Sequence, residues 1–397
     1  MLKVTPFHAR TAALCVSHAW RRWAGYVVAS SYELQHDREY HAIRSSAALL
    51  DVSPLYKYLV TGPDAERLLD RVVTRDVARS RVSQVLYTPW CDAAGKVIDD
   101  GTISRLDEQR FRMTSAEANL RWLHHNAAGL DVAIEDVSES TAALALQGPN
   151  ARTILQQLTD GDLAGLKYYR LTAATLRGMP VTISRTGYTG DLGYEIWMPT
   201  TNALAVWDAL IEAGTPYGLT PAGILALDVA RIEAGLMLIE VDYVSAHRAL
   251  IEGQKSSPFE LNLGWTVSLE KEHFVGRGAL AVEVRRGPAW QLVGLEVDWD
   301  SLERLYADVG LAPRLPTVAW RTSVPIYAAA RSEQVGYATS GCWSPLLKKY
   351  LALAHLRSGY AAPGTRVDME VTVEHRRRLA SARVVRTPFY NPERKRA

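Results

Sequence analysis

Two adjacent aspartates, Asp99 and Asp100, lie in a segment whose pattern predicts a β-hairpin, YTPWCDAAGKVIDDGTIS. One strand ends near Trp90, the residues from Asp92 to Gly95 form the turn, and the returning strand carries both carboxylates. Because side chains alternate along a strand, the two carboxylates point to opposite faces and cannot form a shared acid/base pair. We therefore expect one to serve chemistry and the other to have a structural role. The alternative is that both cap the hairpin or lie in water at the strand end.

A second candidate segment is rich in glycine, SRTGYTGDLGYEIWMP, and spans Ser184 to Pro199. Glycine permits a positive φ and lets a flat ligand approach the backbone closely. The segment is not a phosphate-binding loop, because it has neither GxGxxG after a strand nor a GKS or GKT ending. Its mixture of aromatic rings and a carboxylate favours a ligand site over the alternative, an ordinary hairpin with a polar rim. The residues of that mixture are Tyr188, Tyr194 and Glu195.

The cysteines and histidines do not predict a metal site. Cys15, Cys91 and Cys342 are far apart, odd in number and without CxxC spacing, which also argues against disulfides and fits a reducing cytoplasm. His36 and His41 are not at the i, i+4 spacing of HExxH, and the adjacent histidine pair further along must diverge. The serines lack a GxSxG elbow, so a hydrolase triad is not expected either.

The charge of the chain is balanced, with 45 lysines and arginines against 43 acidic residues, and the two signs are interspersed. This pattern gives no electrostatic footprint for nucleic acid or for an acidic membrane surface. The N-terminal residues lack the order of a signal peptide, and no stretch approaches the ~18 apolar residues of a spanning helix. We expect a cytoplasmic chain whose partner is a small molecule or a protein.

The length of 397 residues points to two or three structural units, because a single core stops growing at about 250–300 residues. One pattern occurs twice, in YLVTGPDAERLLDRV and LALQGPNARTILQQL: a short apolar strand, a Gly-Pro turn and an amphipathic helix. Asp64 and Asn150 are the predicted helix N-caps. The repetition favours internal duplication over the chance occurrence of two similar turns. Further helices are predicted at 203–212 and 222–234.

The C-terminal part has a different pattern. From Gln291 onward, alternating strands separated by Gly and Pro turns predict a separate all-β barrel. The Pro-bearing stretch from Leu311 to Pro325 is expected to form a long ordered loop. The predicted fold class is therefore α+β with a C-terminal β unit.

Several segments, taken together and in order, resemble the glycine-cleavage T-protein (aminomethyltransferase) family and more closely its tetrahydrofolate-dependent demethylase relatives. They include LLDVSPLYKYLVTGPDA, GKVIDDG, ALQGP, SRTGYTGDLGYEIW, ATSGCWSPLLKK and RTPFYNP. The resemblance implies a T-protein-like folate-binding fold of intertwined α/β units with a C-terminal β-barrel. On that pattern, residues 1–285 form the folate-binding region and residues 286–397 the barrel. The folate-binding region would consist of two subdomains, 1–52 with 138–285, and 53–137.

The resemblance also implies site residues, with tetrahydrofolate as the one-carbon acceptor. Asp100 falls on the family's acid/base or orienting aspartate, and a carboxylate there could accept a proton from folate. Glu195 resembles the pterin reader, since one carboxylate can accept both N–H groups of the pterin edge. Tyr87, Tyr169, Tyr188 and Trp265 fall at or near positions where the family packs aromatic rings along the folate.

Some positions depart from the T-protein pattern, and we assign them to the substrate side. Leu227 stands where T-proteins commonly have an arginine, and Ser115 lies in a TSAE segment where they have Asn-Ala. The stretch at 236–239 reads LMLI in place of tyrosines, and an insertion falls around 301–325. If the leucines line the pocket, the donor should be less anionic and more apolar than an aminomethyl-lipoyl arm. The alternative is that they are only helix core.

These departures favour a tetrahydrofolate-dependent demethylase, which would move a methyl or methylene group from a small N-, O- or S-methylated substrate to tetrahydrofolate. The alternative is a glycine-cleavage aminomethyltransferase that acts on an aminomethyl-lipoyl carrier protein. A rival from another class is a non-catalytic folate-binding assembly factor. Those proteins carry a Lys-Gly-Cys-Tyr-type motif at the Gly-Tyr-Thr-Gly position, which this chain lacks.

Overall fold

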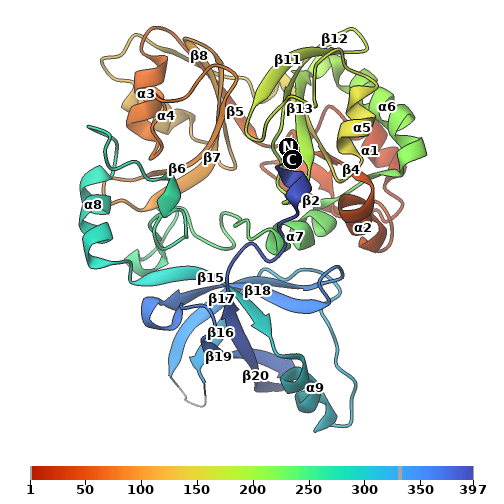
Figure 1. Cartoon of the computed structure of the whole chain (residues 1–397), viewed down its shortest axis with the longest axis vertical. Helices are drawn as coiled ribbons and strands as arrows, with labels where there is room; N and C mark the ends of the chain where they lie inside the picture. Colours follow the sequence, from red (N-terminus) through yellow and green to blue (C-terminus); the bar gives the residue numbers. More distant parts are fainter. Residues whose placement is uncertain (1, 330–332, 397) are drawn as a thin grey trace.

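The computed structural model describes residues 2–329 and 333–396 and divides their strands among three open sheets and one closed barrel. Figure 1 shows two α/β lobes side by side with the barrel below them. Within the described ranges, no helix is long and apolar enough to cross a membrane. The predicted α+β class with a C-terminal barrel is confirmed.

The first lobe is built on a six-stranded sheet with the order β11-β12-β13-β10-β4-β14. Strand β4 comes from the N-terminal segment, whereas the other strands follow the part of the chain that forms the second lobe. Because β4 pairs antiparallel with β10 and parallel with β14, the N-terminal segment lies inside the sheet. The strands are β4 (Ala47–Asp51), β10 (Thr141–Gln147), β11 (Leu171–Leu176), β12 (Met179–Ser184), β13 (Gly193–Pro199) and β14 (Leu219–Pro221).

The second lobe is built on a five-stranded sheet with the order β6-β7-β8-β5-β9. Strands β6 and β7 form the predicted hairpin, in which Trp90 pairs with Asp99. The strands are β5 (Tyr56–Thr61), β6 (Val85–Cys91), β7 (Val97–Asp107), β8 (Arg110–Ser115) and β9 (Ala133–Asp136), and the helices are α3 (Ala65–Val72) and α4 (Leu120–Asn126). A small sheet near the N-terminus holds β1 (Lys3–Val4), β2 (Trp20–Trp23) and β3 (Tyr26–Ala29).

The predicted strand-turn-helix unit occurs twice, because β5 leads into α3 and β10 leads into α5 (Ala151–Gln156). Each turn has a glycine at the same place, with φ of 121° at Gly62 and 124° at Gly148. A Cβ at Gly62 would lie 2.8 Å from the Asp131 carbonyl oxygen, and one at Gly148 2.7 Å from the Ser46 carbonyl oxygen. Both turns therefore need glycine.

Asp64 and Asn150 occupy the predicted N-cap positions, but the expected capping bonds are absent, since neither side chain makes a capping hydrogen bond. An Asp64 carboxylate oxygen instead accepts from the Asp131 N–H at 2.8 Å. The Asn150 amide donates to the Tyr217 carbonyl at 3.0 Å. Each side chain binds the segment that approaches its turn, so tertiary contacts outweigh the local capping preference.

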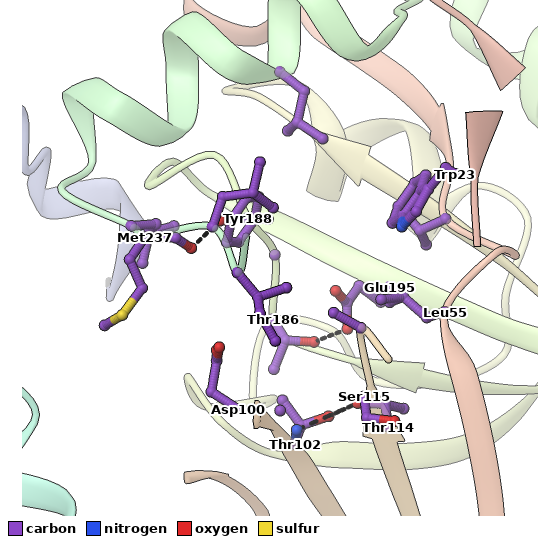
Figure 2. Close-up of a pocket in the computed structure, with 18 of the residues that line it drawn as sticks. Trp23, Leu55, Asp100, Thr102, Thr114, Ser115, Thr186, Tyr188, Glu195 and Met237 are labelled. Atoms are coloured by element: carbon purple, nitrogen blue, oxygen red, sulfur yellow. Dashed lines mark hydrogen bonds between the residues drawn. The ribbon is translucent and has the colours of Figure 1, made fainter. Parts of the chain in front are cut away.

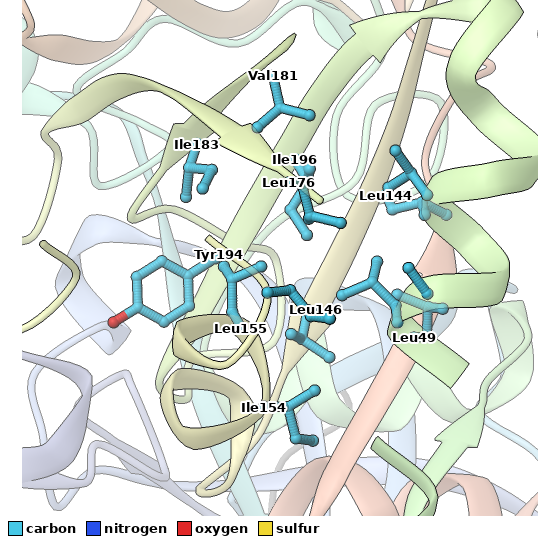
Figure 3. Packing of buried hydrophobic residues seen from close by; sticks show 14 of the residues in the cluster. Leu49, Leu144, Leu146, Ile154, Leu155, Leu176, Val181, Ile183, Tyr194 and Ile196 are labelled. Atoms are coloured by element: carbon cyan, nitrogen blue, oxygen red, sulfur yellow. The ribbon is translucent and has the colours of Figure 1, made fainter. Parts of the chain in front are cut away.

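The six-stranded sheet is covered on both faces. Leu144 and Leu146 of β10 pack with residues of α5 and α6 in one core cluster, which Figure 3 shows from close by. Ala143 and Ala145, on the other face, pack with residues of α2 and α7. The predicted helices at 203–212 and 222–234 appear as α6 and α7. The helices around this sheet are α1 (His8–Leu14), α2 (Asp37–Ser45), α6 (Ala203–Gly214) and α7 (Ile224–Glu233).

The barrel closes in the order β15-β18-β17-β16-β19-β20, and the chain reaches it through α8 (Arg277–Arg286). The predicted loop from Leu311 holds no helix or strand until β16 begins at Val324, and the helix before it, α9 (Trp299–Ala307), was not predicted. Asp298 caps α9 by accepting from the Ser301 N–H at 2.7 Å. The division into units at 285 and 286 stays a prediction. The barrel strands are β15 (Trp290–Val297), β16 (Val324–Ala328), β17 (Gln334–Ser344), β18 (Lys349–Arg357), β19 (Arg366–Val373) and β20 (Arg376–Val385).

Leu146→Ala should lower the free energy of unfolding by about 2–5 kcal/mol, because it removes a fully buried side chain and leaves a cavity. Urea unfolding followed by tryptophan fluorescence measures this change. Leu379→Ala is the matched control, since Leu379 of β20 is 43% exposed, and its effect should stay within about 0.5 kcal/mol. Equal losses in the two variants would contradict the packing described for β10.

Candidate functional site

A cavity of about 280 Å³ lies where the two lobes meet α7. Its walls come from β7 and β8 of the second lobe, from β13 and the loop before it, from β2, from α7, and from residues 236–239. Arg321, in the segment that leads into β16, completes the lining. Figure 2 shows Asp100 and Glu195 in the walls of this pocket, on strands of different sheets.

Asp100 faces this cavity from β7 and accepts two hydrogen bonds. One carboxylate oxygen accepts from the Tyr87 hydroxyl at 2.8 Å, and the other accepts from the Tyr243 hydroxyl. Burial raises the pKa of the Asp100 carboxyl, and the hydroxyls of Tyr243 and Tyr87 partly offset that rise. The next residue must be glycine, because a Cβ at Gly101 would lie 1.9 Å from the Thr114 carbonyl oxygen of β8.

Asp99 lies on the opposite face of β7 and is fully buried. Its carboxylate accepts from the N–H groups of Asp100 at 2.8 Å and Glu117 at 3.0 Å, and from the Asn119 amide at 2.8 Å. Burial, followed by the charge of Asp100, raises the pKa of Asp99 well above its ordinary value. These contacts are structural: Asp99 orders the segment after β8, and Asp100 alone of the two lines the cavity.

Glu195 faces the same cavity from β13. One of its carboxylate oxygens accepts from the Thr186 hydroxyl at 2.6 Å. Burial raises the pKa of Glu195, while the Thr186 hydroxyl and the Arg112 guanidinium oppose that rise. A half-buried carboxylate on a cavity wall suits a ligand that presents N–H donors, because such donors replace the water that partial burial removes.

The glycines before β13 serve the protein more than a ligand, which corrects part of the sequence interpretation. A Cβ at Gly187 or Gly193 would lie within 2.3 Å of the Gln147 side chain, so both glycines make room for that residue. Gln147 in turn donates to the Thr186 carbonyl at 3.2 Å and fixes the loop beside Glu195. Gly190 has φ of 73° and is the one of the three that needs a positive φ.

The predicted aromatic residues do not all lie in one place. Tyr87, Tyr169 and Tyr188 line the cavity. The Tyr188 hydroxyl donates to the Met237 carbonyl, a contact that Figure 2 also shows. Trp265 is outside the lining and 63% exposed, and its ring stacks near Tyr87 with centroids 6.2 Å apart. It is placed at the approach to the cavity and not within it.

Leu227 and Ser115, the predicted substrate-side residues, both line the cavity. Leu227 is also buried and contributes to the core between α7 and the sheet, so it is a core residue that in addition lines the cavity. The Ser115 hydroxyl donates to the Glu117 carbonyl at 2.7 Å. All of residues 236–239 line the cavity, so the LMLI stretch forms part of its apolar wall.

Sequence reasoning missed Tyr243, Arg21 and Arg321. Tyr243 lies four residues after the LMLI stretch, which stands where T-proteins have tyrosines. A tyrosine so close to that stretch could have indicated a site residue. Arg21 and Arg321 line the cavity from β2 and from the segment before β16. Because these two arginines are far in sequence from each other and from α7, no pattern in the sequence indicated that they line one cavity.

The barrel fixes the loop that carries Tyr243. The Asp242 carboxylate accepts from the hydroxyls of Thr339 at 2.6 Å and Ser340 at 2.7 Å, both on β17. It also accepts from Arg231 of α7. The position of the Tyr243 hydroxyl, which donates to Asp100, therefore depends on the first lobe and the barrel together. Among the described residues, no group of three or more His, Cys, Asp or Glu side chains could hold a metal ion.

Comparison with known proteins identifies the family. A family model described as the GCVT N-terminal domain matches residues 5–271, and one described as the glycine cleavage T-protein C-terminal barrel domain matches residues 308–391. This chain belongs to the glycine cleavage T-protein family. The resemblance predicted from its sequence is confirmed.

Relatives of this T-protein family member match it over most of their length. An aminomethyltransferase of Moorella thermoacetica is 35% identical over 399 residues, which cover 99% of each chain. One of Halothermothrix orenii is 35% identical over 355 residues, 88% of this chain and 90% of the relative. The crystal structure of glycine cleavage system aminomethyltransferase T from Bartonella henselae, at 24% identity, shares the fold with a TM-score of 0.83 over 98% of this chain and 99% of that chain.

These names bear on the functional predictions. They support the predicted alternative, an aminomethyltransferase, better than the demethylase that the sequence departures favoured. In terms of chemistry, the site can exchange a proton at Asp100, since a carboxyl whose pKa is raised by burial takes up a proton more readily. It can bind N–H donors at Glu195.

Replacing both tyrosines on Asp100, in a Tyr87→Phe/Tyr243→Phe variant, should raise the pKa of Asp100 above that of the wild type. The hydroxyl bonds favour the charged carboxylate, so their loss favours the protonated form. Infrared or carbon NMR titration of the carboxyl signals measures this pKa as the titration midpoint. The signal that disappears in Asp100→Asn is assigned to Asp100.

The control for this titration is Tyr217→Phe, since Tyr217 lies at the surface after α6. It should leave the midpoint unchanged. An unchanged or lower midpoint in the double variant would contradict the assigned hydrogen bonds.

Because burial raises the pKa of Asp100, its contribution to stability is full below the unfolded-state pKa and is lost as the pH rises through the folded-state pKa.

Proposed function

We propose that this chain transfers a one-carbon unit to tetrahydrofolate, with an aminomethyl group on a lipoyl carrier protein as the donor. The observation that carries the proposal is the convergence of Asp100 and Glu195, from strands of two sheets, on one cavity. Membership of the T-protein family and the names of the relatives support the same reaction class.

The residues of the cavity fit a pterin. Glu195 is half-buried with a free capacity to accept further N–H groups, and the 2-amino-pyrimidinone edge of a pterin presents such groups. Tyr87, Tyr169 and Tyr188 offer rings to a flat ligand from separate segments of the lining. When bound, tetrahydrofolate supplies the nitrogen that receives the one-carbon unit.

Asp100 is the residue to which we assign proton transfer. Its carboxyl is held on both oxygens by tyrosine hydroxyls, so its orientation toward the cavity is fixed before any ligand binds. Burial raises its pKa, which makes the carboxyl a better proton acceptor than an exposed aspartate. The lining around it is largely apolar, and a dry site strengthens the electrostatic effect of the carboxylate.

One observation favours a second candidate, the tetrahydrofolate-dependent demethylase. Leu227 and the residues of the LMLI stretch give the donor side of the cavity an apolar wall, which suits a small methylated compound. The non-catalytic assembly factor has less support, because such a protein does not require the two tyrosine hydroxyls that fix Asp100.

Turnover with different donors separates these functions. The chain is incubated with tetrahydrofolate and either aminomethyl-lipoyl carrier protein or a panel of methylated amines, sulfonium compounds and methoxy-aromatics. One-carbon folates are followed by mass, and ammonia is measured. We expect ammonia release with the carrier at a rate above that with every free donor. Faster methyl-folate formation from a free donor would establish the demethylase instead, and no transfer from any donor would contradict both.

Asp100→Asn should reduce this turnover by the ~10²–10⁴ that a lost general acid/base costs, and leave folate affinity within a few-fold. Asp99→Asn is the matched control, with the same chemical change one residue earlier. Asp99 accepts three N–H groups in the interior, so this variant should lose thermal stability and keep most of its turnover per folded molecule. If the two variants exchange these effects, the faces of β7 have been assigned the wrong way round.

A further inference from the structure

One wall of the cavity carries an unusual concentration of guanidinium groups around a single carboxylate, that of Asp228 on α7. Arg321 donates to one Asp228 oxygen from two nitrogens, at 2.6 and 3.0 Å. The nearest nitrogen of Arg21 lies 3.6 Å from the same oxygen, and that of Arg231 lies 3.6 Å from the other. Arg231 also pairs with Asp242. Three cations thus share two carboxylates, and the cluster has a net positive charge.

Arg21 is the member of this cluster that makes no hydrogen bond to either carboxylate. Arg231 also has buried nitrogens without an acceptor, Nε and Nη2, but its Nη1 donates to Asp242. The terminal nitrogen Nη1 of Arg21 is buried and has no hydrogen-bond acceptor among the described residues. The distance of 3.6 Å to Asp228 is too long for a hydrogen bond. Burial, and then the charge of Arg321, lowers the pKa of Arg21, while Asp228 opposes the shift. A further anion beside Arg21 and Arg321 would provide an acceptor for Arg21 Nη1 and would offset the repulsion between the two guanidinium groups.

The two arginines come from parts of the chain that are 300 residues apart in sequence. Arg21 lies on β2, whereas Arg321 lies in the segment between α9 and β16, and both contribute to the cavity lining. The α7 residue next to Asp228 is Leu227, which brings no charge of its own. Arg22 of β2 also lines the cavity. The two lining arginines that lie beside Asp228 are Arg21 and Arg321, whose side chains are each 31% exposed.

We propose that Arg21 and Arg321 form a subsite for a carboxylate group on a ligand of this cavity. A carboxylate has two acceptor oxygens that match the planar guanidinium fork, so it can take the nitrogens that Asp228 leaves free. The neighbouring wall is apolar, with Trp23, Ile224 and Leu227. The ligand thus combines one carboxylate with an apolar body.

The position of the subsite sets the orientation of that ligand. In Figure 2, Trp23, from the same strand as Arg21, lies across the pocket from Asp100. A ligand anchored by its carboxylate at Arg21 would extend its other end toward Asp100. The carboxylate can belong to the tail of the folate acceptor or to a one-carbon donor such as an N-methylated amino acid. This inference rests on the proposed function for the identity of the folate, and the subsite itself recognises the carboxylate.

Calorimetry on the full chain tests the subsite with two matched ligand pairs. The first pair is tetrahydrofolate and tetrahydropteroate, which lacks the glutamate. The second pair is N-methylalanine and its primary amide. We expect the wild type to bind the carboxylate member of one pair roughly tenfold to a hundredfold more tightly, as charge-assisted hydrogen bonds do. A preference in the first pair assigns the folate tail, and one in the second pair assigns the donor.

Arg21→Gln and Arg321→Gln should each reduce that preference. Arg314→Gln is the matched control, because Arg314 is an exposed arginine of the same segment as Arg321 and is outside the lining of this cavity. It should keep the preference of the wild type. Arg21→Gln removes no hydrogen bond from Nη1, so this variant keeps the test valid if Arg321→Gln fails to fold.

The outcomes separate the subsite from the proposed function. If the wild type prefers the carboxylate in neither pair, or if the preference survives in both arginine variants, the subsite is overturned. Failure of the wild type to bind either folate would contradict the proposed function alone, since the amino-acid pair still tests the arginines. Loss of folate binding in Glu195→Gln with an unchanged carboxylate preference in the arginine variants would overturn the subsite and leave the function intact.

Discussion

A buried carboxylate loses its water, and that cost must be offset by hydrogen bonds if the group is to stay charged. Asp100, which is half-buried on the cavity wall, meets this constraint with two tyrosine hydroxyls, and each reaches it from a different part of the chain. Tyr87 lies on the neighbouring strand β6, while Tyr243 lies in the loop after α7. The second lobe, the α7 loop and the barrel that fixes this loop through Asp242 must therefore assemble before Asp100 has both of its hydrogen bonds.

The position of α7 depends on a second buried carboxylate, Glu233 at its C-terminal end. Glu233 accepts hydrogen bonds from Tyr40 and Arg44 of α2 and from Ser344 of β17. A buried ion pair with these additional donors specifies one arrangement, because removal of a partner leaves an uncompensated charge. Through this contact the barrel and the first lobe hold α7 in place. α7 in turn presents Leu227 and Asp228 to the cavity.

Local patterns in the sequence were sufficient for several features. Alternation along β7 predicted that Asp99 and Asp100 would face opposite ways, and the repeated Gly-Pro segments predicted two strand-turn-helix units. The strand pattern after Gln291 predicted the barrel. Each of these features is set by residues that are close in sequence, so spacing and residue type carry the information.

Contacts between distant segments could not be predicted in the same way. Gly187 and Gly193 make room for Gln147, a partner some 40 residues earlier on β10, although their pattern suggested a ligand. The caps expected at Asp64 and Asn150 were replaced by bonds to other segments. Arg21 and Arg321 meet only because β2 and the segment after α9 both pack against α7. Such meetings are fixed by tertiary packing, which a single sequence does not display.

If Asp100 and Glu195 act on one ligand from two sheets, a crystal structure of this chain with tetrahydrofolate bound will show both contacts. The 2-amino-pyrimidinone edge should donate to the Glu195 carboxylate, and the nitrogen which receives the one-carbon unit should lie within hydrogen-bond reach of Asp100. A pterin bound away from Glu195, or one whose reactive nitrogen lies on the side of the cavity away from Asp100, would contradict this arrangement.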